Sequence, residues 1–412
     1  MIKKIKTVLL IAHDALPVPD VYGGAIEFLI TRLLEENENN GQLRFVVTST
    51  YFKESKRFNY KNSRIYYFEN NKLSGDHYGN FAFNYWKWYH RRIRLTNKIF
   101  HNRITKQLFG NPRKMMDCIT FQLLQITKKE KPNYAVVELC RNINQILPII
   151  NKIGKENVYY HIHNHMLQDM RIRSIIPNSI SISEFVKKEW AVNASIIGDN
   201  RVLYNCADLM FFNNIRVSQK IKLKKRLKIC NDEVVILFCG RFIPGKGVKQ
   251  LLDAMGILQD KKIKLLLIGS EKFANGNISS FSKQIVERAK AMENVIYLGY
   301  IPNDKLPQYY SISDIQVIPS IWQEGAGIVA IEGMAMGLPL IITDSGGMVE
   351  YVNDECAVKV PISENLNENL ANEILRLSND DMLRKKMGFA GKMRAKKFSS
   401  KNYYQNFVKI FE

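Results

Sequence analysis

This 412-residue chain is poor in the features that mark several protein classes. Its six cysteines form no C-x-x-C pair, so neither a zinc site nor a disulfide framework is expected, and a reducing cytosol is the expected compartment. No apolar stretch approaches the roughly 18 residues of a transmembrane helix, and there is no low-complexity tract or solenoid repeat. The apolar run 8–12 is too short for a signal peptide and predicts a buried first strand.

Acidic residues are scarce relative to basic ones. The chain has 39 Asp and Glu against 60 Lys and Arg, which gives a net charge of +21. This excess favours an anionic partner, and nucleic acid, an anionic membrane, a nucleotide sugar and a lipid phosphate all qualify. The remaining composition, 46% hydrophobic and 24% charged, is that of a soluble globular protein long enough for two domains.

The segment 81–114 has no acidic residue and nine basic ones, interspersed with aromatic residues such as Trp86 and Trp88. Aromatics beside Lys and Arg suit a bilayer interface, where each basic residue contributes about 1 kcal/mol at an anionic leaflet. A solvated helix with its aromatics in the core is the alternative. Nucleic acid is not an expected partner, because no nucleic-acid-binding motif accompanies the segment. A second basic run, 216–228, is interpreted as a solvated helix face.

Apolar runs alternate with amphipathic segments along the whole chain, which predicts βαβ units and parallel sheets. We therefore predict an α/β fold with two doubly wound domains and a boundary between residues 204 and 215. Strands are expected at 8–12, 44–48, 64–68, 134–139, 158–161 and 179–183, and then at 234–239, 264–268, 295–298, 315–318 and 340–343.

Two glutamates, Glu324 and Glu332, follow the expected strand 315–318. The small residues 325–327 form a loop whose backbone can approach a ligand closely, and the next residues suit a short helix. Both carboxylates would then face the usual ligand crevice of an open α/β sheet, where a carboxylate can accept two hydrogen bonds from ribose hydroxyls. In isolation, such a pair is more often a helix cap and a solvated glutamate.

Two glycine-bearing loops also follow predicted strands. Gly23 and Gly24 open a helix after the first strand, where amide N–H groups can face an anion. After the strand 234–239, Arg241 and Lys246 lie five residues apart and can place two cations on one diphosphate. The spacing is not that of a Walker A loop.

Three alternating histidines, His161, His163 and His165, share one side if they lie on a strand. Metal binding is the most specific interpretation of that spacing. We expect no metal site, because no carboxylate or cysteine lies close by to complete it.

The stretch 320–347 resembles the donor-sugar signature of the retaining glycosyltransferases of family 4, which have the GT-B fold. Ala326 replaces the usual aromatic residue and Gly333 the usual alanine. The loop with Arg241 and Lys246 resembles the family's diphosphate-binding pattern. The matching positions in the donor signature are Glu324, Gly327, Glu332, Met334, Ala335, Gly337, Pro339, Gly346 and Gly347.

The resemblance implies two Rossmann-like domains facing a central cleft. Residues 1–207 would form the acceptor-side domain and 208–395 the domain that binds the nucleotide sugar, and 396–412 would be a helix crossing back to the first domain. The implied catalytic residues are Glu324, His163, Arg241 and Lys246, with His165 as the alternative histidine. The implied donor-binding residues are Gly23, Gly24, Arg241, Lys246, Tyr300, Glu324, Gly325, Ala326, Gly327, Ile328, Val329 and Glu332.

The activity that the resemblance implies is that of a retaining hexosyltransferase. It would move a sugar from a nucleoside diphosphate, with UDP-GlcNAc, UDP-Glc or UDP-Gal as expected donors, to a glycan or lipid-linked glycan of a bacterial surface polysaccharide or lipopolysaccharide. No metal or other cofactor is expected. The expected location is the cytoplasm, with a peripheral contact of 81–114 on the inner membrane face left open. The alternatives are an epimerase of the same fold and a catalytically dead basic scaffold protein.

Overall fold

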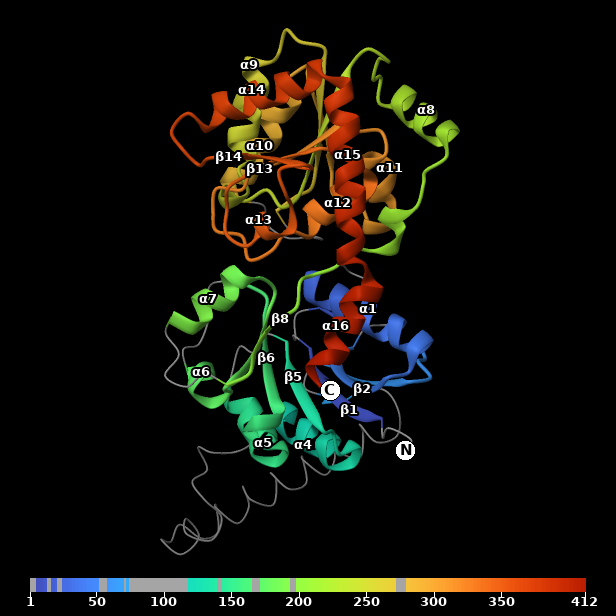
Figure 1. The fold of residues 1–412 in the computed structure, drawn as a ribbon, viewed down its shortest axis with the longest axis vertical. Coiled ribbons are helices and arrows are strands. Elements are labelled where there is room, and N and C mark those ends of the chain that lie inside the picture. The colour runs from blue at the N-terminus through green and yellow to red at the C-terminus, as the bar shows by residue number, and fades with distance from the viewer. Residues whose placement is uncertain are drawn as a thin grey trace, which may run out of the picture. The chain divides into compact units, whose positions relative to one another are not determined.

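The computed structural model describes residues 5–12, 16–20, 24–51, 58–69, 72–73, 118–138, 143–164, 171–192, 198–271 and 279–412. The segment 81–114, Gly23 and His165, to which the sequence analysis assigned roles, lie outside the described residues. The chain forms two compact units (Figure 1). Unit 1 comprises Met1–Ile180, Ala191–Arg201 and Phe407–Glu412, and unit 2 comprises Ser181–Trp190 and Val202–Asn406.

The first sheet has the strand order β4-β3-β2-β1-β5-β6-β7-β8. Along the sheet, the strand numbers fall from β4 to β1 and then rise from β5 to β8, so the order reverses between β1 and β5. β1 pairs in parallel with both β2 and β5, and its residues Val8 and Leu10 are fully buried, as expected of a central parallel strand covered on both faces. The strands are β1 Lys6–Ile11, β2 Leu43–Thr50, β3 Ser63–Glu69, β4 Lys72–Leu73, β5 Tyr134–Val137, β6 Val158–Ile162, β7 Asn178–Ser181 and β8 Asn200–Val202.

The end of the chain completes the core of unit 1. The last helix, α16 (Ser400–Ile410), brings Phe407 to 5.8 Å from Phe45, ring centre to ring centre. Phe411 lies 5.0 Å from Tyr134, again between ring centres. The predicted return of the C-terminal helix to the first domain is thus confirmed. The helices around the first sheet are α1 Ala25–Asn40, α4 Cys118–Glu130, α5 Ile143–Ile153, η3 Lys155–Asn157 and α6 Arg171–Ile175. The next helix, α7 Glu184–Val192, belongs to unit 2 except for its last two residues.

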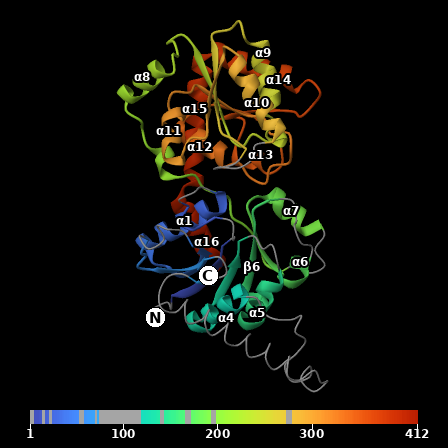
Figure 2. The same ribbon diagram turned by 180° about the vertical axis from the view of Figure 1, so that it is seen from behind.

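The second sheet has the strand order β11-β10-β9-β12-β13-β14, with its own reversal between β9 and β12. Successive residues of β9 belong to hydrophobic clusters on opposite faces of the sheet. Val235 packs with α11 and α12, and Ile236 packs on the other face with α9, α10 and α14 (Figure 2). This alternation follows from the two-residue period of a strand. The strands are β9 Val234–Cys239, β10 Ile263–Ile268, β11 Val295–Gly299, β12 Ile315–Ile318, β13 Leu340–Thr343 and β14 Ala357–Val360.

Helices cover both faces of this sheet, so the predicted doubly wound architecture is confirmed for unit 2 as well. None of the helices in the described ranges is long and apolar enough to cross a bilayer. The helices are η4 Leu209–Phe212, α8 Val217–Arg226, η5 Pro244–Lys246, α9 Val248–Ile257, α10 Ser280–Ala291, η6 Asn303–Lys305, α11 Leu306–Tyr310, α12 Ile328–Met336, α13 Met348–Tyr351, α14 Leu366–Asn379, α15 Asp381–Ala395 and η7 Lys396–Phe398.

Candidate functional site

Two loops meet at the carboxyl ends of β9 and β12, the neighbouring strands between which the second sheet reverses its order. The loop after β9 carries Arg241 and Lys246, and the loop after β12 carries Glu324. Crevices outside the strands at such a reversal are the usual ligand sites of open α/β sheets. The strand order therefore brings together two stretches that are far apart in the sequence.

Glycines allow the backbones of these loops to touch. Gly247 has φ +68°, and a Cβ added to it would lie 1.8 Å from the carbonyl oxygen of Pro319. The N–H of Ile321 donates to the carbonyl of Gly245 at 2.9 Å. Any side chain at position 247 would push the loops apart, so glycine is required there for their contact.

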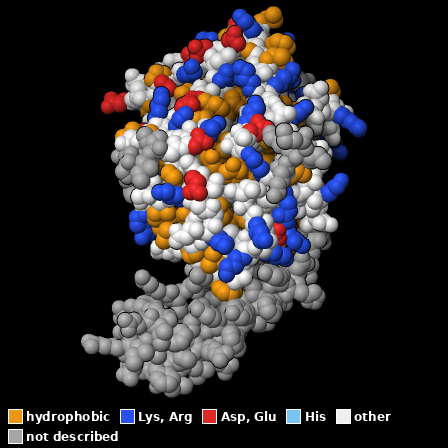
Figure 3. All heavy atoms as spheres, turned by 60° about the horizontal axis from the view of Figure 1, so that its bottom comes forward, with side chains coloured by type: hydrophobic (Ala, Val, Ile, Leu, Met, Phe, Trp, Pro, Cys, Tyr) orange, Lys and Arg blue, Asp and Glu red, His pale blue; other side chains and the backbone are white. Residues whose placement is uncertain are grey.

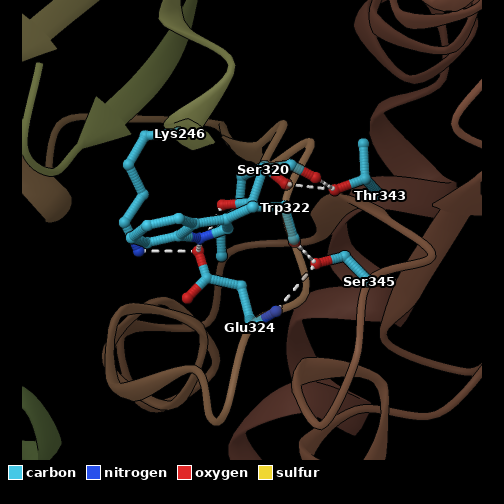
Figure 4. Close-up of polar contacts among 7 residues, drawn as sticks. Lys246, Ser320, Trp322, Glu324, Thr343 and Ser345 are labelled. Carbon is cyan, nitrogen blue, oxygen red and sulfur yellow. Dashed lines mark hydrogen bonds and ion pairs between the residues drawn. The ribbon is translucent and has the colours of Figure 1, made fainter. Parts of the chain in front are cut away.

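The side chain of Glu324 is held by three donors (Figure 4). Its Oε1 accepts from Lys246 Nζ at 2.6 Å, from Ser320 Oγ at 2.6 Å and from Trp322 Nε1 at 2.7 Å. The carboxylate is largely buried, with 8% of the residue exposed. Charge-assisted hydrogen bonds of this kind are about twice as strong as neutral ones, so Glu324 has a fixed orientation before any ligand binds.

The loop after β13 fixes the backbone of Glu324. The N–H of Gly347 donates to the Glu324 carbonyl at 2.6 Å. Gly346 has φ +54°, and a Cβ on it would lie 2.3 Å from that same oxygen. Ser345 Oγ donates to the Trp322 carbonyl at 2.6 Å. The Gly-Gly pair of the sequence signature therefore positions Glu324.

Lys246 also lies 5.2 Å from the centre of the Trp322 ring, a cation–π contact. An ammonium group has three donors, so Lys246 can keep one bond to Glu324 and offer others to an anion. Arg241, on the same loop, is exposed and forms no hydrogen bond or ion pair with the described residues. The structure thus brings Lys246 and Glu324 together but leaves Arg241 apart from their hydrogen-bond network.

Glu332 lies one turn inside α12, as predicted, and its neighbour is Tyr310 on α11. The Tyr310 hydroxyl donates to Glu332 Oε2 at 2.8 Å. Burial raises the pKa of Glu332 to about 7, with the Tyr310 bond opposing the shift. A carboxylate in this apolar setting needs a hydrogen-bond partner. The sequence analysis did not identify Tyr310 as that partner.

The other residues predicted to bind the donor differ in their distance from the Lys246–Glu324 centre. Gly327 is the N-cap of α12, and the N–H of Ala330 donates to its carbonyl at 3.0 Å. The first amides of α12 belong to Ile328 and Val329, and free N–H groups at a helix start favour an anion. Tyr300 follows β11, away from the strand reversal, and is 43% exposed.

In unit 1, Gly24 is the N-cap of α1, with φ +103°. A Cβ added to it would lie 2.2 Å from Glu27 Oε2, so a carboxylate already occupies this helix start. Burial raises the pKa of Glu27 to about 7, and the nearby Asp20 and Glu138 charges add to that rise. The sequence analysis assigned no role to this buried carboxylate.

His163 is hydrogen-bonded to a second missed residue, Glu138, at the end of β5. Its Nε2 lies 2.7 Å from Glu138 Oε2, and His161 Nδ1 lies 2.8 Å from the same oxygen. The expectation that no carboxylate lies near the histidines is therefore wrong. β5 and β6 are neighbours in the sheet, which places the ends of 134–137 and 158–162 side by side.

The two contacts of Glu138 are a hydrogen bond with His163 and an ion-pair contact with His161. Two zinc ligands, each about 2.1 Å from the metal in a tetrahedron, lie about 3.4 Å apart, and both separations here are shorter. Burial alone would raise the pKa of Glu138, but His161 and His163 outweigh it and lower the pKa to about 2. The carboxylate is therefore ionised and positions the imidazoles.

Two of the missed residues had a signal in the sequence. Ser320 and Trp322 lie four and two positions before Glu324 and could have been proposed as its local donors. Glu27 lies three positions after Gly24, in the first turn of the same helix, so it too had a local signal. Tyr310 and Glu138 had none, because each reaches its partner from another element.

The described geometry agrees with three similarities to known proteins. Residues 219–394 match the family model of glycosyl transferases group 1. An uncharacterized glycosyltransferase of Methanocaldococcus jannaschii is 31% identical over 43% of this chain and 44% of its own length. The lipopolysaccharide 1,2-N-acetylglucosaminetransferase of Salmonella typhimurium is 27% identical over 47% of this chain and 50% of its own length. The chain thus spans about half the length of these curated relatives.

The fold has a solved counterpart. The structure of HepE from Anabaena in complex with UDP superimposes with a TM-score of 0.70 at 16% identity, covering 99% of both chains. The predicted GT-B class, two Rossmann-like domains with parallel sheets, is confirmed. Residues 219–394, which include the Lys246–Glu324 centre, are thus similar to the glycosyl transferases group 1 family.

Proposed function

We propose that this protein is a retaining glycosyltransferase that moves a hexose from a nucleoside diphosphate to a glycan or lipid-linked glycan acceptor in bacterial surface polysaccharide synthesis. The observation that carries the proposal is the contact of Lys246 with Glu324 at the strand reversal of the second sheet. A cation for a phosphate and an acid for hydroxyl groups, side by side, match the two parts of a sugar diphosphate. The proposed donor is UDP-linked GlcNAc, Glc or Gal.

In the proposed reaction, the bond between the anomeric carbon and the diphosphate oxygen breaks, and its electron pair goes to the diphosphate. Lys246, together with Arg241 from the same loop, stabilises the charge on this leaving group. The acceptor hydroxyl then bonds to the anomeric carbon on the face that the diphosphate left, and its proton passes to a diphosphate oxygen. No metal is required, because fixed cations serve the leaving group.

The carboxylates bind the rest of the donor. Glu324 Oε1 is engaged by its three donors, so Oε2 is the oxygen that we assign to sugar hydroxyls. Glu332 binds the ribose hydroxyls, which replace or join the Tyr310 hydroxyl as its donors. On the acceptor side, His163, oriented by Glu138, lies near the reacting sugar in the proposed complex.

A polysaccharide or lipid-linked acceptor is supported by two observations. One relative acts on lipopolysaccharide by its name. The net charge of +21 favours acceptors that carry phosphate or that lie at an anionic membrane. Lys and Arg side chains are scattered widely over the face drawn in Figure 3, among fewer Asp and Glu.

The test is a thermal-shift panel of UDP-, GDP-, ADP- and CDP-sugars, followed by turnover assays on the sugars that bind. We expect a UDP-sugar to raise the unfolding temperature. NMR of the product then reports the anomeric configuration. Consumption of the donor without an acceptor, giving an epimeric sugar nucleotide, would identify an epimerase instead. No shift with any sugar nucleotide, together with salt-sensitive binding of polyanions, would identify a scaffold.

A further inference from the structure

The helix α8 (Val217–Arg226) holds a positive charge that nothing in the described chain neutralises. Across 216–228 there are seven basic residues and no acidic one, and none of the seven forms an ion pair with the described residues. Other helices differ: on α15, Asp381 pairs with Lys385. The charge of α8 is thus available to an external anion.

Two aliphatic side chains on α8 are also exposed. Val217 is 71% and Ile221 is 63% exposed, and their spacing of four residues puts them on one side of the helix. Leu223, on another side, is buried in the core of unit 2. At about 100° per residue, Lys224 and Lys225 lie on opposite sides of the Val217–Ile221 stripe. The exposed surface is thus an aliphatic stripe between lysines.

The helix lies at the margin of unit 2. Both ribbon views show α8 at the edge of this unit, beside α11 (Figures 1 and 2). The contact with α11 includes a hydrogen bond from Arg226 Nη2 to the Tyr309 hydroxyl at 3.4 Å. A broad flat partner could therefore reach the stripe.

We propose that α8 is a docking surface for an anionic lipid bilayer. A bilayer satisfies both parts of the surface: Val217 and Ile221 enter the boundary between head groups and acyl chains, and the lysine stems extend their ammonium groups to the lipid phosphates. A nucleic acid would pair with the cations but leave the two aliphatic side chains in water. This inference does not rest on the proposed sugar transfer, because lipid binding is measured without a donor.

The first experiment measures co-sedimentation of the full chain with phosphatidylcholine vesicles, with and without phosphatidylglycerol. We expect binding only to the anionic vesicles, and weaker binding as salt is raised. The double variant Lys222→Glu/Lys225→Glu changes two exposed residues and should bind about tenfold more weakly or worse. Its matched control, Lys283→Glu/Lys290→Glu on α10, makes the same charge change on another exposed face and should bind like wild type.

The second experiment tests the aliphatic stripe. Val217→Asp/Ile221→Asp should lose vesicle binding at low salt, whereas Ile257→Asp, at a residue 55% exposed on α9, should keep it. Wild-type vesicle binding by both α8 variants would overturn the proposal, and so would equal losses in the α8 variants and their controls. Loss of RNA oligonucleotide binding with vesicle binding retained would assign α8 to nucleic acid instead. Thermal unfolding measures whether each variant is folded. If the aspartate variant proves unfolded, the Lys222→Glu/Lys225→Glu variant, which changes only exposed residues, tests the proposal by itself.

Discussion

The ammonium group of Lys246 lies 2.6 Å from Oε1 of Glu324, although the two residues are 78 positions apart in the sequence. An anionic ligand that approaches Lys246 must share it with this carboxylate. Because Ser320 and Trp322 also donate to Oε1, Glu324 keeps two partners when Lys246 turns toward a diphosphate. Lys246 can therefore leave Glu324 for a diphosphate while the Glu324 carboxylate stays in place.

Loss of either cation should slow the reaction. We expect Lys246→Ala and Arg241→Ala each to reduce turnover by about 100-fold or more, because each removes a fixed charge from the leaving diphosphate. Steady-state kinetics with the donor identified by thermal shift measures this. Lys261→Ala, at an exposed residue beyond α9, is the matched control and should turn over like wild type. Wild-type rates in the Lys246 or Arg241 variant would remove that residue from the leaving-group role.

Trp322→Phe should weaken donor binding more than it affects the fold. The variant keeps an aromatic ring beside Lys246 but loses the Nε1–H donor to Glu324. A hydrogen bond to a charged group contributes about 1.5–3 kcal/mol, so we expect a rise of about tenfold in KM for the donor sugar. Isothermal titration with the nucleotide alone is the control, because UDP lacks the sugar that Glu324 binds. Equal losses for UDP and UDP-sugar would argue against this role of Glu324.

Alanine substitutions at two glycines should change the free energy of unfolding in opposite directions. Gly247→Ala forces a left-handed backbone on alanine and pushes its Cβ against the Pro319 carbonyl, so we expect a loss of about 2 kcal/mol or more in unfolding free energy. Gly256→Ala, within α9, meets nothing within 4 Å and should raise it by about 0.5–1 kcal/mol. Urea unfolding of both variants measures the difference. Equal effects would show that the loop contact is not rigid.

Glu332 should make stability depend on pH. Burial raises its pKa from 4.5 to about 7, so the folded chain binds a proton more tightly than the unfolded chain does. Stability from this group is present below pH 4.5 and is lost as pH rises toward 7. The loss is about 3 kcal/mol at most.

The measurement is urea unfolding of wild type and Glu332→Gln across this pH range. The glutamine variant should lose less stability as pH rises and should be the more stable protein at the alkaline end. Glu364→Gln, at an exposed residue, should follow wild type. A variant as pH-dependent as wild type would show that Glu332 does not titrate in this range.

Turnover should persist in excess chelator, because the cations of the donor loop replace a metal. The assay is donor turnover with and without EDTA, with metal content measured in the purified protein. Strict metal dependence would contradict this expectation. It would also point to Glu138, His161 and His163, whose ligand atoms lie close together.

Much of the fold follows from local pattern. Each predicted strand has a counterpart, because the interior strands of a doubly wound sheet are continuous apolar runs that need no partner to be recognised. The short edge strands β4, β8 and β14 were missed. β4 has two residues and β8 has three, and β14 is buried only at its two ends, Ala357 and Val360. A short edge strand lacks the continuous apolar signal of the interior.

The sequence by itself determined the doubly wound class and the candidate residues Lys246, Glu324 and Glu332, because strand ends, glycine loops and carboxylate spacing are local features. Only the tertiary structure decided which residues meet. Strand order placed Lys246 beside Glu324 and Glu138 beside His163, and helix packing placed Tyr310 beside Glu332. Strand order is a property of the whole sheet, so no spacing within one segment could reveal these contacts.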